Sequence, residues 1–129
     1  MELIDVSPNN TVFLKLLKRE LKEFVIPKMK YNDKILILTD PNNDNRYVSM
    51  VFFTLYLDKC SINYIHTSSK YRRQGHSLFL IQKALAVAKV HGCNYCNVAI
   101  LPDCGSDIVF SKLGFKYVSE TSMIFNLSL

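Results

Sequence analysis

The chain carries Tyr71-Arg72-Arg73-Gln74-Gly75-His76-Ser77 between a strand-like run, residues 61–67, and an apolar helical run, residues 77–91. A strand, a glycine-containing turn and a helix N-terminus direct several unpaired backbone N–H groups at one point, which also carries the positive end of the helix dipole. Gly75 lets the backbone approach a ligand closely, and the two arginines add cationic donors. The stretch therefore predicts a phosphate-binding turn.

These residues resemble the pyrophosphate-binding signature of the GNAT acetyltransferase superfamily, Arg-x-x-Gly-x-(Gly or Ala), with Ser77 as the last small residue. A second segment, Phe110-Ser111-Lys112-Leu113-Gly114-Phe115, resembles the superfamily's aromatic-x-x-x-Gly-Phe segment. The spacing between them suits an intervening helix and strand. The resemblance covers residues 48–129, and the first third of the chain matches only by its pattern of elements. Two motifs in this order outweigh the alternative of a loop with two solvated arginines.

Length and composition favour one globular domain, residues 1–129, with a single core. An apolar fraction of 49% and an aromatic fraction of 12% argue against disorder. No apolar run reaches the roughly 18 residues of a membrane-spanning helix. The N-terminus lacks the basic and apolar regions of a secretory signal. We therefore expect an intracellular, cytoplasmic protein with no membrane partner.

Cys93 and Cys96 have the two-residue gap of a zinc knuckle or redox pair. No second paired set of Cys or His accompanies them, so we expect no metal site and instead buried thiols in a reducing compartment. The net charge of +5 is compatible with a nucleic-acid partner. However, Glu20, Glu23 and Asp33 interrupt the basic run in the first part of the chain, which favours a solvated helix face.

Hydrophobic periodicity predicts a mixed α/β chain with the order β-α-β-β-β-α-β-α-β-β. The first helix has its apolar positions from Val12 to Phe24 and is stopped by Pro27. Gly92 and Gly114 suit the ends of the two later helices. The strands are expected at residues 3–6, 34–39, 47–57, 61–67, 95–101, 115–118 and 123–127, and the later helices at residues 77–91 and 106–113.

The resemblance implies the GNAT fold, a central splayed mixed β-sheet flanked by helices, here with one N-terminal helix where many relatives have two. The strands at 61–67 and 95–101 would start parallel and then splay apart. Acetyl-CoA would enter the gap, and its pantetheine arm would pair with the edge of the first of these strands. The cofactor contacts that the resemblance implies are Ile65, His66, Thr67, Arg72, Arg73, Gln74, Gly75, His76, Ser77 and Phe110.

The resemblance leaves the catalytic residues unassigned. Several relatives place a Glu or His base where this chain has Ser61 and Asn63, which would line the acceptor substrate. The superfamily's Tyr acid falls on Phe110, which has no proton to give. The oxyanion donor, a backbone N–H at a strand bulge, falls near residues 65–67. His66 is a candidate base by its chemistry, but strand alternation turns it away from its neighbours and favours a structural role.

The resemblance thus implies an acetyl-CoA-dependent N-acetyltransferase that acts by direct transfer on an amine of a small molecule or a protein. The alternative is a catalytically weakened homologue that binds acyl-CoA as a sensor or interaction module. A small nucleic-acid binder is a third reading, which fits the charge but not the interrupted basic run. The sequence identifies neither the amine nor the oligomeric state, and a homodimer stays open.

Overall fold

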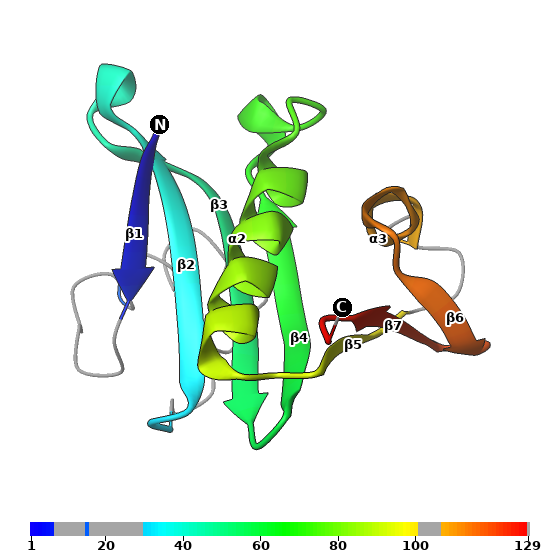
Figure 1. The fold of residues 1–129 in the computed structure, drawn as a ribbon. Helices are drawn as coiled ribbons and strands as arrows, with labels where there is room; N and C mark the ends of the chain where they lie inside the picture. The colour runs from blue at the N-terminus through cyan, green and yellow to red at the C-terminus, as the bar shows by residue number, and fades with distance from the viewer. Residues whose placement is uncertain (7–14, 16–29, 101–106, 129) are drawn as a thin grey trace.

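The structure is a computed structural model that describes residues 1–6, 15, 30–100 and 107–128 (Figure 1). The sheet has seven strands, which are β1 (Glu2–Val6), β2 (Asp33–Asp40), β3 (Arg46–Tyr56), β4 (Lys59–Thr67), β5 (Tyr95–Ala99), β6 (Lys116–Ser119) and β7 (Ser122–Asn126). The described helices are α2 (His76–His91) and α3 (Asp107–Leu113), with 3₁₀ turns η1 (Pro41–Asn43) and η2 (Ser69–Tyr71).

The order of the described elements is the one predicted from the sequence, and most boundaries differ by one or two residues. The first helix, predicted around Val12 to Phe24, lies outside the described residues apart from position 15. Helix α2 ends as expected, because Gly92 takes φ +97° and the N–H groups of Gly92 and Cys93 bond back to carbonyls of the last turn. Gly114 follows the last residue of α3 with φ +104°, so both glycines end their helices as predicted.

The sheet is mixed, with strand order β1-β2-β3-β4-β5-β7-β6 and one parallel pair, β4 with β5. That pair covers only residues 59–62 of β4 against residues 95–98 of β5, although β4 continues to Thr67. Beyond this point the two strands separate, as Figure 1 shows to the right of α2. The predicted splayed sheet is confirmed.

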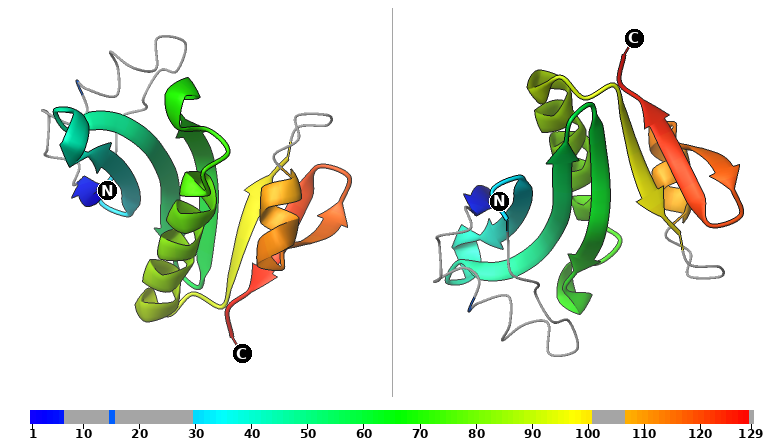
Figure 2. Two further views of the ribbon diagram at one scale, coloured as in Figure 1. Left: turned by 90° about the horizontal axis from the view of Figure 1, so that it is seen from above. Right: turned by 90° about the horizontal axis from the view of Figure 1, so that it is seen from below.

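Each face of the sheet carries its own apolar cluster, because alternate side chains of a strand point to opposite faces. On β2, Leu36 and Leu38 join the cluster under α2 and α3, whereas Ile35 and Ile37 join the cluster on the other face. Figure 2 shows α2 against the curved half of the sheet formed by β2, β3 and β4, and α3 against the half that contains β5 and β7. This packing holds the N-terminus of α2 at the place where β4 and β5 part.

Three cysteines lie within this core. Cys60 and Cys96 face each other across the parallel pair, and with Cys93 they are buried free thiols. Hydrogen bonding with Cys60, followed by burial, raises the pKa of the Cys96 thiol, and burial raises the pKa of Cys93. Cys104 lies outside the described residues. Within the described ranges, no three His, Cys, Asp or Glu side chains gather as metal ligands, and no helix has the length and apolarity to cross a membrane.

The raised pKa values predict that the protein loses stability at alkaline pH. The thiols of the unfolded chain ionise above about pH 8.5, while the raised pKa values of Cys93 and Cys96 keep these two thiols neutral in the folded state, so the unfolded state then binds fewer protons. The free energy of unfolding should be unaffected below that pH and fall above it by up to about 1.4 kcal/mol per pH unit for each thiol. Urea denaturation of wild type and Cys96→Ala between pH 8 and 10.5 measures this effect. Cys96→Ala should start less stable but show the shallower decline, and parallel declines would contradict the assignment.

Candidate functional site

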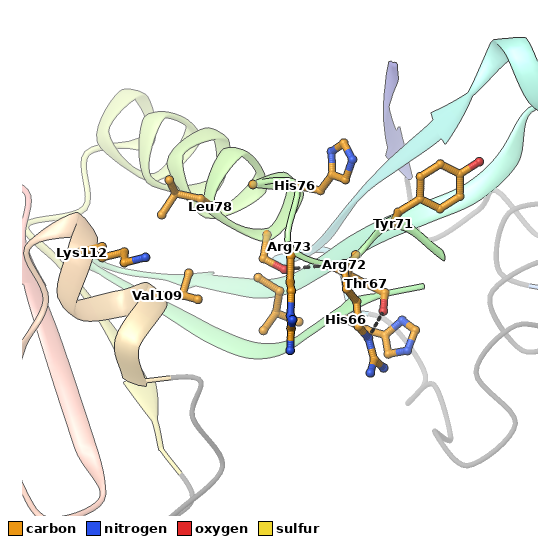
Figure 3. Close-up of a pocket in the computed structure, with 12 residues that line it drawn as sticks. His66, Thr67, Tyr71, Arg72, Arg73, His76, Leu78, Val109 and Lys112 are labelled. Carbon is orange, nitrogen blue, oxygen red and sulfur yellow. Dashed lines mark hydrogen bonds between the residues drawn. The ribbon is translucent and has the colours of Figure 1, made fainter. Parts of the chain in front are cut away.

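A cavity of about 650 Å³ opens where the end of β4, the N-terminus of α2 and the inner side of α3 meet. Figure 3 shows Val109 and Lys112 of α3 facing Arg73 and Leu78 across the opening. Most of the residues predicted to contact a cofactor line this space, namely Ile65, His66, Thr67, Arg72, Arg73, Gly75, His76 and Ser77. The fold thus brings the strand end and the phosphate-binding turn around one cavity.

The turn before α2 has the left-handed conformation that its glycine favours. Gly75 has φ +80°, and a Cβ atom added there would meet no atom within 4 Å. The first intrahelical bond runs from the Phe79 N–H to the Gly75 carbonyl over 3.0 Å. The N–H groups of residues 76–78 therefore lack an intrahelical acceptor and lie at the positive end of the helix dipole. This geometry and the open space above Gly75 fit a phosphate oxyanion.

The charge of the lining also fits an anion. Arg72, Arg73 and Lys112 contribute three cationic side chains, and none of the described lining residues carries a carboxylate. One hydrogen-bond donor of Arg72 is already used within the protein, because its Nε–H donates to the Thr67 carbonyl over 3.2 Å. Arg73 and Lys112 approach from opposite sides of the cavity, from the turn and from α3 (Figure 3). A polyanionic ligand would therefore meet positive charge on both walls.

The strand wall of the cavity is an open sheet edge. From residue 63 to Thr67, β4 pairs with β3 on one side and, among the described strands, with none on the other. A strand edge presents N–H and C=O groups that an extended ligand can bond as an added strand would. The cavity therefore joins a polar edge for an extended arm to a turn for a phosphate.

Tyr71 lines the cavity although it is not among the residues predicted to contact a cofactor. Its hydroxyl donates to Asp40 Oδ2 over 2.9 Å and accepts from Asn43 Nδ2 over 3.2 Å, so it is tied to the turn between β2 and β3. Its ring meets the His76 ring edge-on, with centroids 6.2 Å apart. The ring is buried. This contact fixes η2 and the following turn against the sheet.

Two of the predicted cofactor residues do not line the cavity. The Phe110 side chain is 2% exposed and packs edge-on against Phe115, with ring centroids 5.1 Å apart. Its apolar neighbours make it a core residue, which corrects the prediction of a direct contact. The Gln74 residue instead lines a smaller pocket together with Met1 and Leu3, and its Oε1 lies 3.3 Å from His76 Nε2. Only the backbone of Gln74 remains a candidate contact.

The bulge of β4 lies earlier than predicted. The register with β3 shifts between Phe52 and Phe53, which pair with Tyr64 and Ile62 and leave Asn63 as the extra residue. The predicted bulge at residues 65–67 is therefore wrong. Asn63 donates from Nδ2 to Thr54 Oγ1 over 2.8 Å, and Ser61 donates to Asn97 Oδ1 over 2.8 Å. Neither Ser61 nor Asn63 lines the cavity, and their role in lining an acceptor stays a prediction.

His66 has its backbone at the cavity and its side chain on the other face of the sheet. Its Nδ1 lies 2.8 Å from the Tyr47 hydroxyl, and its ring stacks with those of Tyr47 and Tyr64. Thr67, the next residue, instead bonds Ser77 of α2. The pleat thus separates the two side chains as the alternation of the strand predicts.

Val109 and Lys112 were missed as lining residues although the sequence contained a signal for them. They are three positions apart on α3 and therefore lie on one face of the helix, as neighbours of this spacing do. Within that segment the resemblance assigned a role only to the aromatic position, Phe110. The helical spacing of the segment, rather than its motif, would have identified them.

No protein-family model and no curated protein matches the sequence, whereas many solved structures match the fold. An aminoglycoside 6′-acetyltransferase type Ii aligns with TM-score 0.81 at 14% identity, covering 98% of this chain and 97% of that chain. A ribosomal-protein alanine N-acetyltransferase from Escherichia coli gives TM-score 0.80 at 14% identity, with 99% and 96% covered. A GNAT-family acetyltransferase from Staphylococcus aureus aligns with TM-score 0.71 at 12% identity, covering 98% of this chain and 99% of that chain. The chain therefore has the GNAT fold.

The backbone at Arg73 provides a test of the turn. Arg73 has φ +63°, a conformation that costs a non-glycine residue about 1–2 kcal/mol. Arg73→Gly and Arg73→Ala both remove the guanidinium, but only glycine relieves the strain. We expect Arg73→Gly to be more stable than Arg73→Ala by about 1 kcal/mol in urea denaturation. Both variants should bind inorganic pyrophosphate more weakly than wild type, and to the same extent. Equal stability of the two variants would argue against strain at this position.

Proposed function

We propose that this chain is an N-acetyltransferase that moves the acetyl group of acetyl-CoA to an amine. The observation that carries the proposal is the continuity of one cavity from the N-terminus of α2 to the open edge of β4. Coenzyme A has a pyrophosphate at one end of an extended, amide-containing arm, and the two walls offer complementary groups for both. The GNAT fold of the chain is in keeping with this activity.

The fit of acetyl-CoA can be argued group by group. The pyrophosphate would take the backbone N–H groups of residues 73–77, with the Arg73 guanidinium beside it. The amides of the pantetheine arm would bond the β4 edge from Asn63 toward Thr67. Lys112 would face the negative charge from α3. The acetyl thioester would then lie where β4 and β5 part.

Direct transfer needs few side chains. The free amine attacks the thioester carbonyl carbon, a C–N bond forms, and the C–S bond breaks as the tetrahedral intermediate collapses. Backbone N–H groups of β4 would stabilise the oxyanion. The thiolate can leave without a dedicated acid because it is only a weak base, and its conjugate thiol has a pKa of about 8.5. The proton lost by the amine would pass to solvent in the absence of a positioned base.

The acceptor side would be formed by the face of the sheet opposite α2, where Ser61 and Asn63 project from β4. Their side chains could orient an amine or a water molecule, although neither can act as a base at neutral pH. A weakened homologue that binds acyl-CoA without efficient turnover is the second candidate. It is favoured by one specific observation, the burial of Phe110 in the core at the position where relatives carry an acid. Release of free thiol from acetyl-CoA with a panel of amines separates the two.

Substitutions at Gly75 test the phosphate contact. Asp and Asn have nearly the same shape and both tolerate the left-handed conformation, so Gly75→Asp and Gly75→Asn differ mainly in charge. Both should fold, because a side chain at this position enters open space. Asn should weaken coenzyme A binding by occupying the space, and Asp should abolish it by also repelling the phosphates. Isothermal titration calorimetry with coenzyme A on both variants provides the comparison. A folded Gly75→Asp variant that binds coenzyme A as tightly as wild type would contradict the proposal.

The pH dependence of turnover tests the absence of a tuned base. An amine of the lysine type has a pKa near 10.4, so its reactive free-base fraction rises about tenfold per pH unit around neutrality. The rate should therefore climb steadily from about pH 7 to 9. A histidine base would instead make the rate level off above about pH 6.5. A plateau that disappears in His66→Ala but not in Tyr64→Phe, a variant of the tyrosine that stacks on His66, would assign the base to His66.

A further inference from the structure

Three hydroxyl groups from three different elements form a continuous chain beside the cavity. Ser49 of β3 lies 2.8 Å from Thr67 Oγ1 at the end of β4, and Thr67 Oγ1 lies 2.7 Å from Ser77 Oγ in the first turn of α2. At its inner end, Ser49 Oγ donates to the His66 carbonyl over 2.8 Å. Ser49 is fully buried, whereas Thr67 and Ser77 line the cavity.

The direction of donation along this chain is determined by its inner end. A hydroxyl has one proton to donate, and a carbonyl can only accept. Because Ser49 donates its only hydroxyl proton to the His66 carbonyl, its oxygen must be the acceptor in the bond with Thr67. Thr67 therefore donates to Ser49. Thr67 in turn has no proton left for Ser77, so Ser77 donates to Thr67. The Ser77 hydroxyl proton is therefore committed to the protein and points away from a phosphate at the turn.

The chain connects the two walls of the cavity. Thr67 ends the β4 edge, and Ser77 lies in the helix turn that carries the N–H groups for an anion. The connecting residues 68–75 contain only the short 3₁₀ turn η2 and, after it, two left-handed positions, Arg73 and Gly75, so no continuous helix or strand fixes the distance between the two walls. A second tie supports the same corner, because the Ser68 N–H bonds the Val48 carbonyl over 2.8 Å. The hydroxyl chain is thus a direct link between strand edge and helix start.

We propose that Ser49, Thr67 and Ser77 are positioning residues that hold the N-terminus of α2 in register with the free edge of β4. The inference rests on the proposed function, since its consequence is that the pyrophosphate and the pantetheine arm of one coenzyme A molecule bind together. When two parts of a ligand bind at once, the gain in affinity over that of the separate parts depends on the spacing of their subsites. Ser77 contributes its backbone N–H to the phosphate, and its hydroxyl contributes only the link.

The test compares whole coenzyme A with its two parts. Ser49→Ala removes the inner acceptor while leaving every cavity-lining side chain in place. We expect it to weaken coenzyme A binding about three- to tenfold, the effect of one lost hydrogen bond. Pantetheine and 3′-phosphoadenosine 5′-diphosphate, titrated separately by NMR, should keep their affinities within about twofold of wild type. Asp33→Ala is the matched control, because it removes the bonds that Asp33 accepts from Thr54 Oγ1 over 2.7 Å and from the Lys30 N–H over 2.9 Å, away from the cavity. This control should lower the free energy of unfolding but leave unchanged the ratio of the affinity for coenzyme A to the affinities for its two parts.

Ser77→Ala tests the direction of the chain. It should weaken coenzyme A binding at least as much as Ser49→Ala, because it breaks the bond that joins helix to strand, whereas Ser49→Ala breaks the bond that holds Thr67 in place. The double variant should be no worse than Ser77→Ala alone, because Ser49 acts on the helix only through the Thr67–Ser77 bond. The affinity for 3′-phosphoadenosine 5′-diphosphate should be unchanged. A loss of that affinity would mean that the hydroxyl donates to phosphate. Additive losses, or wild-type coenzyme A affinity in folded Ser49→Ala, would overturn the positioning role alone. Failure of the wild-type protein to bind coenzyme A or either part would overturn the proposed function and this inference together.

Discussion

The parting of β4 from β5 is the constraint on which the rest of the structure depends. Parallel strands cannot be joined by a tight hairpin, so the chain must cross over through a helix, and here α2 makes that crossover. Because the strands remain paired only up to Ile62 and Val98, the end of β4 loses its neighbour just before the turn that begins α2. The open strand edge and the unpaired N–H groups of the helix therefore arise next to each other. One topological feature produces both walls of the cavity.

The bulge at Asn63 lies at the same point of β4 and gives the strand end its orientation. The extra residue lets Asn63 and Tyr64 both face away from α2, after which Ile65 and Thr67 turn toward the helix. As a result Thr67 reaches Ser77, while the side chain of the intervening His66 packs between two tyrosines on the other face. The cavity side of β4 is thus built from backbone, the apolar side chain of Ile65 and the small hydroxyl group of Thr67, and the larger polar side chains of the strand end face the opposite surface.

The sequence predicted those features that depend on local conformation. Gly75 and Gly92 adopt the left-handed conformations expected of a turn and a helix end, and the strands follow the apolar, β-branched and aromatic runs of the sequence. It could not predict the bulge, because one extra residue in a strand leaves the apolar pattern nearly unchanged. It also assigned Phe110 to the cavity from a motif position, whereas the direction of that ring is decided by packing against Phe115. The hydroxyl chain joins residues far apart in sequence, so no local pattern could indicate it.

The strained backbone at Arg73 indicates what the site requires from its residues. Glycine would adopt φ +63° without cost, yet this position carries a guanidinium at the mouth of a cavity that has no described carboxylate. An unfavourable conformation persists only where the surrounding structure over-determines it. Here the surrounding structure is the pair of ties from Tyr71 to Asp40 and from Thr67 to Ser77, on either side of the turn. The site thus obtains charge from side chains and geometry from backbone.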